Sequence, residues 1–284
     1  MGGLIRRYPL ISYFVIAYAG TWLVWALFVL SREGSGLLPF HSPSSFLVMI
    51  GIGTFSGPPS ARLSSRPSPR AGRASSGCSG GSCSGASALP GTCSRSSAFL
   101  PAIETLGTIA IPGALASFTP IDLLPELMSA AVFFVYPALL AGPLGEEIGW
   151  RGVALPRLQT LHGPVKASLI LGVLWAFWHA PIWFSGQWSV PSVPNIAVYV
   201  FWIVAVTFIF TWVFNNTRGS VFMAILLHGT MDVFPNAFLL AHLPGAAEMT
   251  SAGGLSMYWG LALGFGLFAL LLVIVTRGRL GKPA

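Results

Sequence analysis

Long apolar windows recur along the whole chain and constrain its fold more than any other feature. A helix needs about 20 apolar residues to cross a hydrocarbon core of about 30 Å. Only 8% of the residues are charged and 54% are hydrophobic, against about 25% charged residues in an average soluble domain. The sequence therefore predicts an all-α, polytopic bundle of about eight transmembrane helices. The windows lie near residues 8–30, 40–58, 98–118, 125–150, 164–184, 194–214, 219–240 and 255–276.

The basic residues give this bundle an orientation, because positive charges mark the cytoplasmic side of a membrane protein. With both termini in the cytoplasm, loops 114–124, 185–194 and 241–254 lie outside, and they contain no Lys or Arg. The inner basic residues are then Arg6, Arg7, Arg157, Lys166, Arg218, Arg277, Arg279 and Lys282. The net charge of +7 is therefore a topology signal and does not indicate nucleic-acid binding. We predict an integral protein of a bacterial plasma membrane.

The segment 61–97 departs from the apolar pattern. It is rich in Ser, Gly, Arg and Pro, and it shows no helix or strand period. Its composition predicts a disordered cytoplasmic segment, or else a stretch that is read out of frame from a GC-rich gene. It separates two N-terminal spans, residues 1–60, from six further spans, residues 98–284. The three cysteines, Cys78, Cys83 and Cys93, all lie in it, without the spacing of a metal or redox site.

Ionisable side chains inside the apolar windows are the candidate functional residues. A charge at bilayer depth costs about 2.5–3.5 kcal/mol on insertion scales, so its presence there indicates a function. The stretch GPLGEEIGWRG places Glu146, Glu147 and Arg151 on one helix. Glu147 and Arg151 are four residues apart and can pair on one face, whereas Glu146 is rotated from Glu147 by about 100°. The alternative is a solvated helix end, at which all three charges face water.

Two later windows each contribute a histidine. His179 lies in LWAFWHAP, and His228 and Asp232 lie four residues apart in LLHGTMDVF. The Asp232 carboxylate can accept the ring N–H of His228 and so fix the tautomer of the imidazole. Glu146, His179 and His228 each lie 10 to 13 residues from an inner basic residue, which is about 15–20 Å along a helix. We therefore expect the three at a common depth near mid-membrane; the alternative for each histidine is a packing role.

Together these motifs resemble those of the CPBP family of intramembrane proteases, which includes CAAX prenyl endopeptidases and bacteriocin-processing and immunity proteins. EEIGWR matches Glu-Glu-x-x-x-Arg, His179 stands in the place of a Phe-x-x-x-His motif, and HGTMD matches His-x-x-x-Asn/Asp, all in the family's order. The likeness is strong over residues 120–240 and weak at GPPSA, residues 57–61. Trp175 stands where the second motif has Phe, and its ring can still pack one turn below the histidine.

The resemblance implies hydrolysis of a peptide bond in a cavity between helices, on a peptide or membrane-anchored protein substrate. The implied catalytic residues are Glu146, Glu147, Arg151, His179, His228 and Asp232. In this reading Glu146 activates a water molecule with His179. His228 with Asp232 supports either the oxyanion or a metal.

Two ways of activating the water stay open. The chain has no His-Glu-x-x-His zinc motif. Because family members are called metalloproteases, the resemblance still implies Glu146, His179 and His228 as ligands of a divalent ion such as zinc. A glutamate and histidines can also activate water without a metal.

Two other functional classes are consistent with the same residues. One is a catalytically silent peptide-binding or immunity protein, which would keep the fold and bind a peptide without cutting it. The other is a transporter or proton relay, in which intramembrane Glu and His also occur. A transporter predicts inverted repeats, and the sequence contains no such symmetry. No oligomeric state is predicted.

Overall fold

The computed structural model describes residues 7–64, 100–107, 142–186, 191–234 and 256–282, together with residues 109, 116, 118–120, 124–125 and 128. Every regular element among these residues is a helix, and none of them belongs to a strand. The predicted all-α class is therefore confirmed. The predicted outer loop 241–254 lies outside the described residues, and the loops 114–124 and 185–194 are described only in part. The Ser/Gly/Arg-rich segment also lies outside them, except that residues 61–64 end a helix.

Several of the helices are suited to a membrane by length and composition. Among the described residues, three stretches are long and apolar enough to cross it, with mean hydropathies of 1.7, 1.3 and 2.3: Pro9–Val29, Pro143–Trp178 and Val193–Asn216. Shorter apolar helices cover Phe46–Ala61, Val221–Asp232 and Trp259–Val275. Large apolar side chains on the outer faces, such as Leu23 and Leu267, are 72% and 68% exposed. These faces fit a lipid surrounding, as expected for an integral membrane protein.

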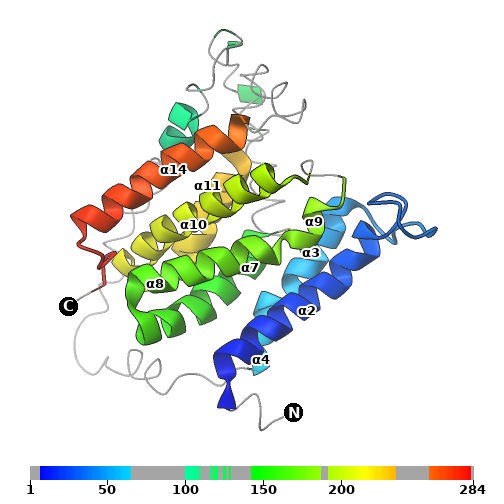
Figure 1. The fold of residues 1–284 in the computed structure, drawn as a ribbon, viewed down its shortest axis with the longest axis horizontal. Helices are drawn as coiled ribbons and strands as arrows, with labels where there is room; N and C mark the ends of the chain where they lie inside the picture. Colours follow the sequence, from blue (N-terminus) through cyan, green and yellow to red (C-terminus); the bar gives the residue numbers. More distant parts are fainter. Residues whose placement is uncertain are drawn as a thin grey trace.

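The N-terminal helices α2 (Pro9–Val29), α3 (Phe46–Ser56) and α4 (Pro58–Ser64) form one flank of the bundle (Figure 1). α2 matches the predicted window closely. The window predicted at 40–58 is helical only from Phe46, and Gly57 separates α3 from α4. Gly57 lies so close to Thr21 of α2 that a Cβ atom would overlap the threonine hydroxyl. Two short helices therefore replace the single predicted one.

The helices α8 (Leu155–Trp178), α10 (Val193–Asn216) and α14 (Ser256–Val275) lie side by side, with α10 in the middle (Figure 1). Ser168 Oγ donates a hydrogen bond to Thr211 Oγ1 at 2.8 Å, between α8 and α10. Membrane helices commonly pack through small and hydroxyl-bearing residues of this kind.

The stretch Pro143–Trp178 turns back on itself at Gly163, which has a φ of 74° and is followed by Pro164. Glycine adopts positive φ without strain, and proline cannot continue the hydrogen-bonded helix in front of it. The sequence predicted a span that ends near residue 150 and a loop before residue 164. Instead, the helix that begins at Pro143 continues to this turn (Figure 1).

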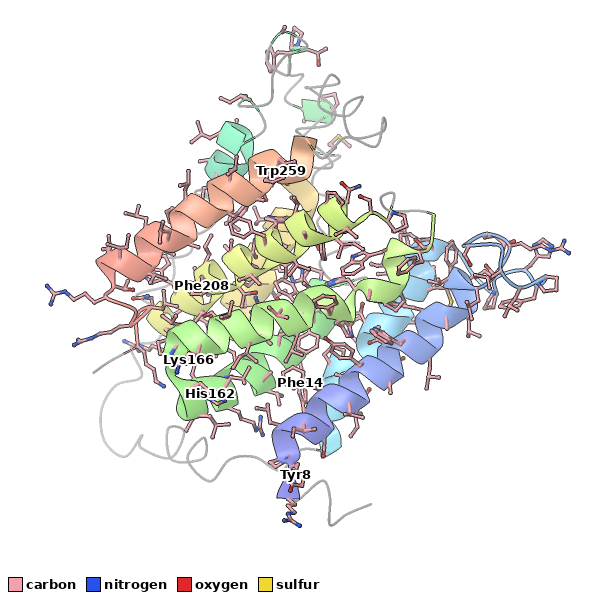
Figure 2. The ribbon with its side chains drawn as sticks, viewed as in Figure 1. Tyr8, Phe14, His162, Lys166, Phe208 and Trp259 are labelled. Atoms are coloured by element: carbon pink, nitrogen blue, oxygen red, sulfur yellow. The ribbon has the colours of Figure 1, made fainter. Side chains whose placement is uncertain are left out.

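Basic residues gather at one end of the bundle. Lys282 Nζ donates to the carbonyl of Gln159 at 3.1 Å, and Figure 2 places Lys166 at the same turn. The C-terminal residues also lie against Asn216, two residues before Arg218. The predicted clustering of these basic residues is therefore present, and the side of the membrane that this end faces stays a prediction.

Candidate active site

The adjacent glutamates lie on α7 (Pro143–Gly149), which begins with proline at its first position, where the missing N–H costs nothing. α7 leads into a single π-helical turn, η3 (Trp150–Ala154), which carries Arg151. Such turns inside α-helices are frequent at functional sites. Arg151 Nη1 donates to Glu147 Oε1 at 2.7 Å. The pairing predicted from the four-residue spacing is present.

These three charged side chains are buried inside the bundle. Glu147 and Arg151 have no exposed surface, and Glu146 is 5% exposed. α4 covers this part of the chain, because a Cβ atom on Gly149 would overlap Pro58. The GPPSA segment therefore packs directly on the glutamate-bearing helix. The alternative of a solvated helix end is wrong.

His228 connects α11 (Val221–Phe234) to the glutamate-bearing helix. Its Nδ1–H donates to Glu147 Oε1 at 2.8 Å, and its Nε2 lies 3.6 Å from Asp232 Oδ2. The sequence predicted that Asp232 would accept the ring N–H and fix the tautomer. The structure differs, because 3.6 Å is too long for such a bond and Glu147 accepts it instead. The two partners are 81 residues apart, so helical spacing does not predict their contact.

His179 faces Glu146. It ends α8 immediately before the short helix α9 (Ala180–Trp183). Its Nδ1–H donates to the carbonyl oxygen of Trp175 at 2.9 Å. Because a carbonyl only accepts, the Nδ1 atom carries the proton, and in the neutral ring the Nε2 atom keeps its lone pair. That Nε2 lies 4.0 Å from Glu146 Oε2.

Trp175 contributes more to the site than the packing that the sequence predicts for an aromatic residue. Its indole Nε1–H donates to Glu146 Oε2 at 2.5 Å. Its ring lies 4.3 Å from Arg151 Cζ, and Phe210 lies 4.2 Å from the same atom. The guanidinium therefore contacts two aromatic rings, a favourable cation–π arrangement. Sequence reasoning missed the hydrogen bond; the replacement of Phe by an N–H-bearing ring was the signal for it.

One cavity of about 230 Å³ brings four of the six predicted residues together. Glu146, His179, His228 and Asp232 line it, and the Glu147–Arg151 pair supports them from the protein interior. The other lining residues are Trp25, Phe46, Leu47, Ile50, Gly142, Trp175, Ile182, Tyr199, Trp202, Ile203 and Met231. A few convergent polar groups in a mostly apolar cavity are typical of a ligand or substrate site.

The three predicted metal ligands, Glu146, His179 and His228, all line this cavity. Among the described residues, no group of three or more His, Cys, Asp or Glu side chains is arranged to hold a metal ion. Tetrahedral N and O ligands about 2.1 Å from zinc lie about 3.4 Å apart, whereas His179 Nε2 and Glu146 Oε2 are 4.0 Å apart. Metal binding stays a prediction, and Glu146 and the two histidines can also activate water as acid and base groups without a metal.

Residues 128–234 match the family described as type II CAAX prenyl endopeptidase, Rce1-like. This segment of the chain is similar to the Rce1-like family. All six predicted site residues lie inside the matched segment. A similar protein is CAAX prenyl protease 2 of Methanococcus maripaludis, which is 32% identical over 108 residues, or 36% of this chain and 39% of that protein. The Rce1-like match confirms the family resemblance that the three motifs predict. The matched segments cover well under half of this chain and of the relative.

Proposed function

We propose that this protein is an intramembrane endopeptidase, which hydrolyses a peptide bond of a membrane-associated protein or peptide. The observation that carries the proposal is the placement of Glu146 and His179 on one cavity, with Oε2 and Nε2 4.0 Å apart. A water molecule that hydrogen-bonds to both atoms at about 2.8 Å fits this separation, with an angle of about 90° at its oxygen.

In the first step, Glu146 accepts a proton from this water as the water oxygen bonds to the substrate's carbonyl carbon. The Nε2 lone pair of His179 accepts the second hydrogen bond of the water and orients it for the attack. General-base assistance of this kind is typically worth about 10²- to 10⁴-fold in rate. Burial inside the bundle strengthens such electrostatic interactions, since little water competes for them.

In the second step, the tetrahedral intermediate collapses and its C–N bond breaks. The proton held by Glu146 passes to the leaving amine, so the glutamate returns to its starting state. His228 acts here in its doubly protonated, imidazolium form. Its Nε2–H, which lies beside Asp232, donates a hydrogen bond to the oxyanion. Glu147 accepts the Nδ1–H of the same ring and keeps its Nε2 facing the cavity, while Arg151 holds Glu147.

The first experiment measures cleavage by the purified protein in detergent micelles. The relative is named a CAAX prenyl protease, so the first substrates are peptides with a C-terminal C-a-a-X sequence. Each is supplied with and without an isoprenyl group on the cysteine, beside a library of apolar peptides. Peptide that binds but stays intact would identify a catalytically silent binding protein and contradict the proposal.

The decisive variant is Glu146→Gln, which keeps the size and shape of the side chain and removes the proton acceptor. The cleavage rate should fall at least about a hundredfold, while the melting temperature stays close to that of the wild type. Glu33→Gln is the matched control, because Glu33 lies in the exposed segment between α2 and α3, away from the cavity lining. Near-wild-type cleavage by Glu146→Gln would exclude this mechanism.

A further inference from the structure

Trp175 contacts four of the six predicted site residues. Its Nε1–H donates to Glu146 Oε2 at 2.5 Å, and its backbone carbonyl accepts the Nδ1–H of His179 at 2.9 Å. Its ring lies 4.3 Å from Arg151 Cζ and packs edge-to-face on His228, with 5.2 Å between the ring centroids.

The indole N–H has a specific use that a phenylalanine could not serve. Trp175 is 1% exposed, so its hydrogen bond to the carboxylate is shielded from water. Other buried indoles, those of Trp150, Trp178 and Trp183, have no hydrogen-bond partner among the described residues. Their rings contribute apolar surface and packing, whereas Trp175 also contributes a directed donor.

This donor determines where the Glu146 carboxylate lies. The nearest nitrogen of His179 is 4.0 Å from Glu146 Oε2, which is beyond hydrogen-bonding distance. The bond from Trp175 thus fixes the carboxylate within reach of a water that is shared with His179. A carboxylate without this bond could rotate about its side-chain torsions and lose that alignment.

We propose that Trp175 is a positioning residue of the active site, whose indole N–H holds the Glu146 carboxylate in the orientation that activates water. The inference rests on the proposed endopeptidase function. It assigns to the tryptophan of this chain a role that the Phe-x-x-x-His pattern lacks. Hydrogen bonds to charged groups have free energies that correspond to about 10- to 100-fold in rate, so the loss of this bond should lower kcat by about that factor.

The test removes the N–H and keeps the shape of the ring. β-(3-Benzothienyl)-alanine, in which sulfur replaces the indole N–H, is incorporated at position 175 by amber suppression. The control protein carries the same residue at position 150, where the native indole is fully buried and lacks a hydrogen-bond partner among the described residues. For both proteins kcat, KM and the melting temperature are measured beside those of the wild type and Glu146→Gln.

The expected result is a kcat lowered about 10- to 100-fold at position 175, with KM and the melting temperature unchanged. The control at position 150 should match the wild type. Equal kcat in the position-175 protein and the wild type would overturn the inference and leave the proposed function intact. A purely structural role predicts a lower melting temperature or a raised KM in place of the fall in kcat, and that result would also overturn it.

A second measurement decides the hydrogen bond without any cleavage assay. An ultraviolet resonance Raman difference spectrum, wild type minus Trp175→Phe, isolates the indole of this residue from the other nine. This spectrum should show a strongly hydrogen-bonded indole N–H. The difference between Glu146→Leu and the double variant Glu146→Leu, Trp175→Phe should show an indole N–H without a hydrogen bond. A free N–H in the wild type would refute the inference, whereas absence of cleavage by the wild type would refute the proposed function.

Discussion

Arg151→Met tests whether the buried ion pair stabilises the site. Arg151 and Glu147 have no exposed surface, and their Nη1 and Oε1 atoms are 2.7 Å apart. Methionine keeps a long side chain and removes the guanidinium. The variant therefore measures the effect of losing the positive charge and its contacts with the two aromatic rings. The Glu147 carboxylate would then stay buried, with His228 as its remaining partner among the described residues.

The magnitude follows from the burial of both groups. Breaking a buried ion pair by removing one partner costs about 3–5 kcal/mol. The contacts of the guanidinium with Trp175 and Phe210, at 4.3 and 4.2 Å, add up to about 2 kcal/mol each. For domains of roughly this size, each kcal/mol of lost stability lowers the melting temperature by about 2–4 °C. The loss of the ion pair alone should therefore lower it by about 6–20 °C.

The assay is thermal unfolding of the purified protein in detergent micelles, with cleavage measured in parallel. Arg279→Met is the matched control, because Arg279 is exposed and exposed ion pairs are worth only about 0–1 kcal/mol. Combining Arg151→Met with Glu147→Gln should recover part of the lost stability, since no isolated carboxylate is left buried. Indistinguishable melting temperatures for Arg151→Met and Arg279→Met would refute this reasoning.

Two predictions from the sequence remain to be measured. In a background whose native cysteines are replaced by serine, cysteines at Ser189 and Ser251 should react with an impermeant thiol reagent in intact cells; reaction at Ser64 in their place would reverse the orientation. If the protein binds a divalent metal, the double variant His179→Ala, His228→Ala should lose that metal after purification. Stoichiometric metal in the double variant would place the ligands elsewhere.

Several helix positions could be predicted from the sequence because the length of an apolar run is a local property. The windows 8–30, 194–214 and 255–276 agree with α2 (Pro9–Val29), α10 (Val193–Asn216) and α14 (Ser256–Val275) to within two residues. The physical reason is that a helix in lipid must satisfy all of its backbone hydrogen bonds within itself and must span a fixed thickness. The break at Gly57 and the continuation of the helix past residue 150 were missed, because they depend on close approaches and backbone angles that apolar composition does not encode.

Part of the site is local in the same sense. Glu147 and Arg151 pair because residues four apart share one face of a helix, and the sequence alone determines this. The same rule placed His228 and Asp232 on one face of another helix, where they do lie 3.6 Å apart. Spacing along one helix, however, does not determine which face of a second helix packs against it.

The contacts that assemble the site belong to the tertiary structure. The ring of His228 bonds to Glu147 across 81 residues, and the indole of Trp175 bonds to Glu146 across 29 residues. Both depend on how α7, α8 and α11 rotate and pack, which is determined by the shapes of many side chains together. The sequence by itself therefore determined the apolar helices α2, α10 and α14 and the set of candidate residues. The packing decided which carboxylate meets which nitrogen, because a hydrogen bond depends on distances of tenths of an ångström that no spacing rule specifies.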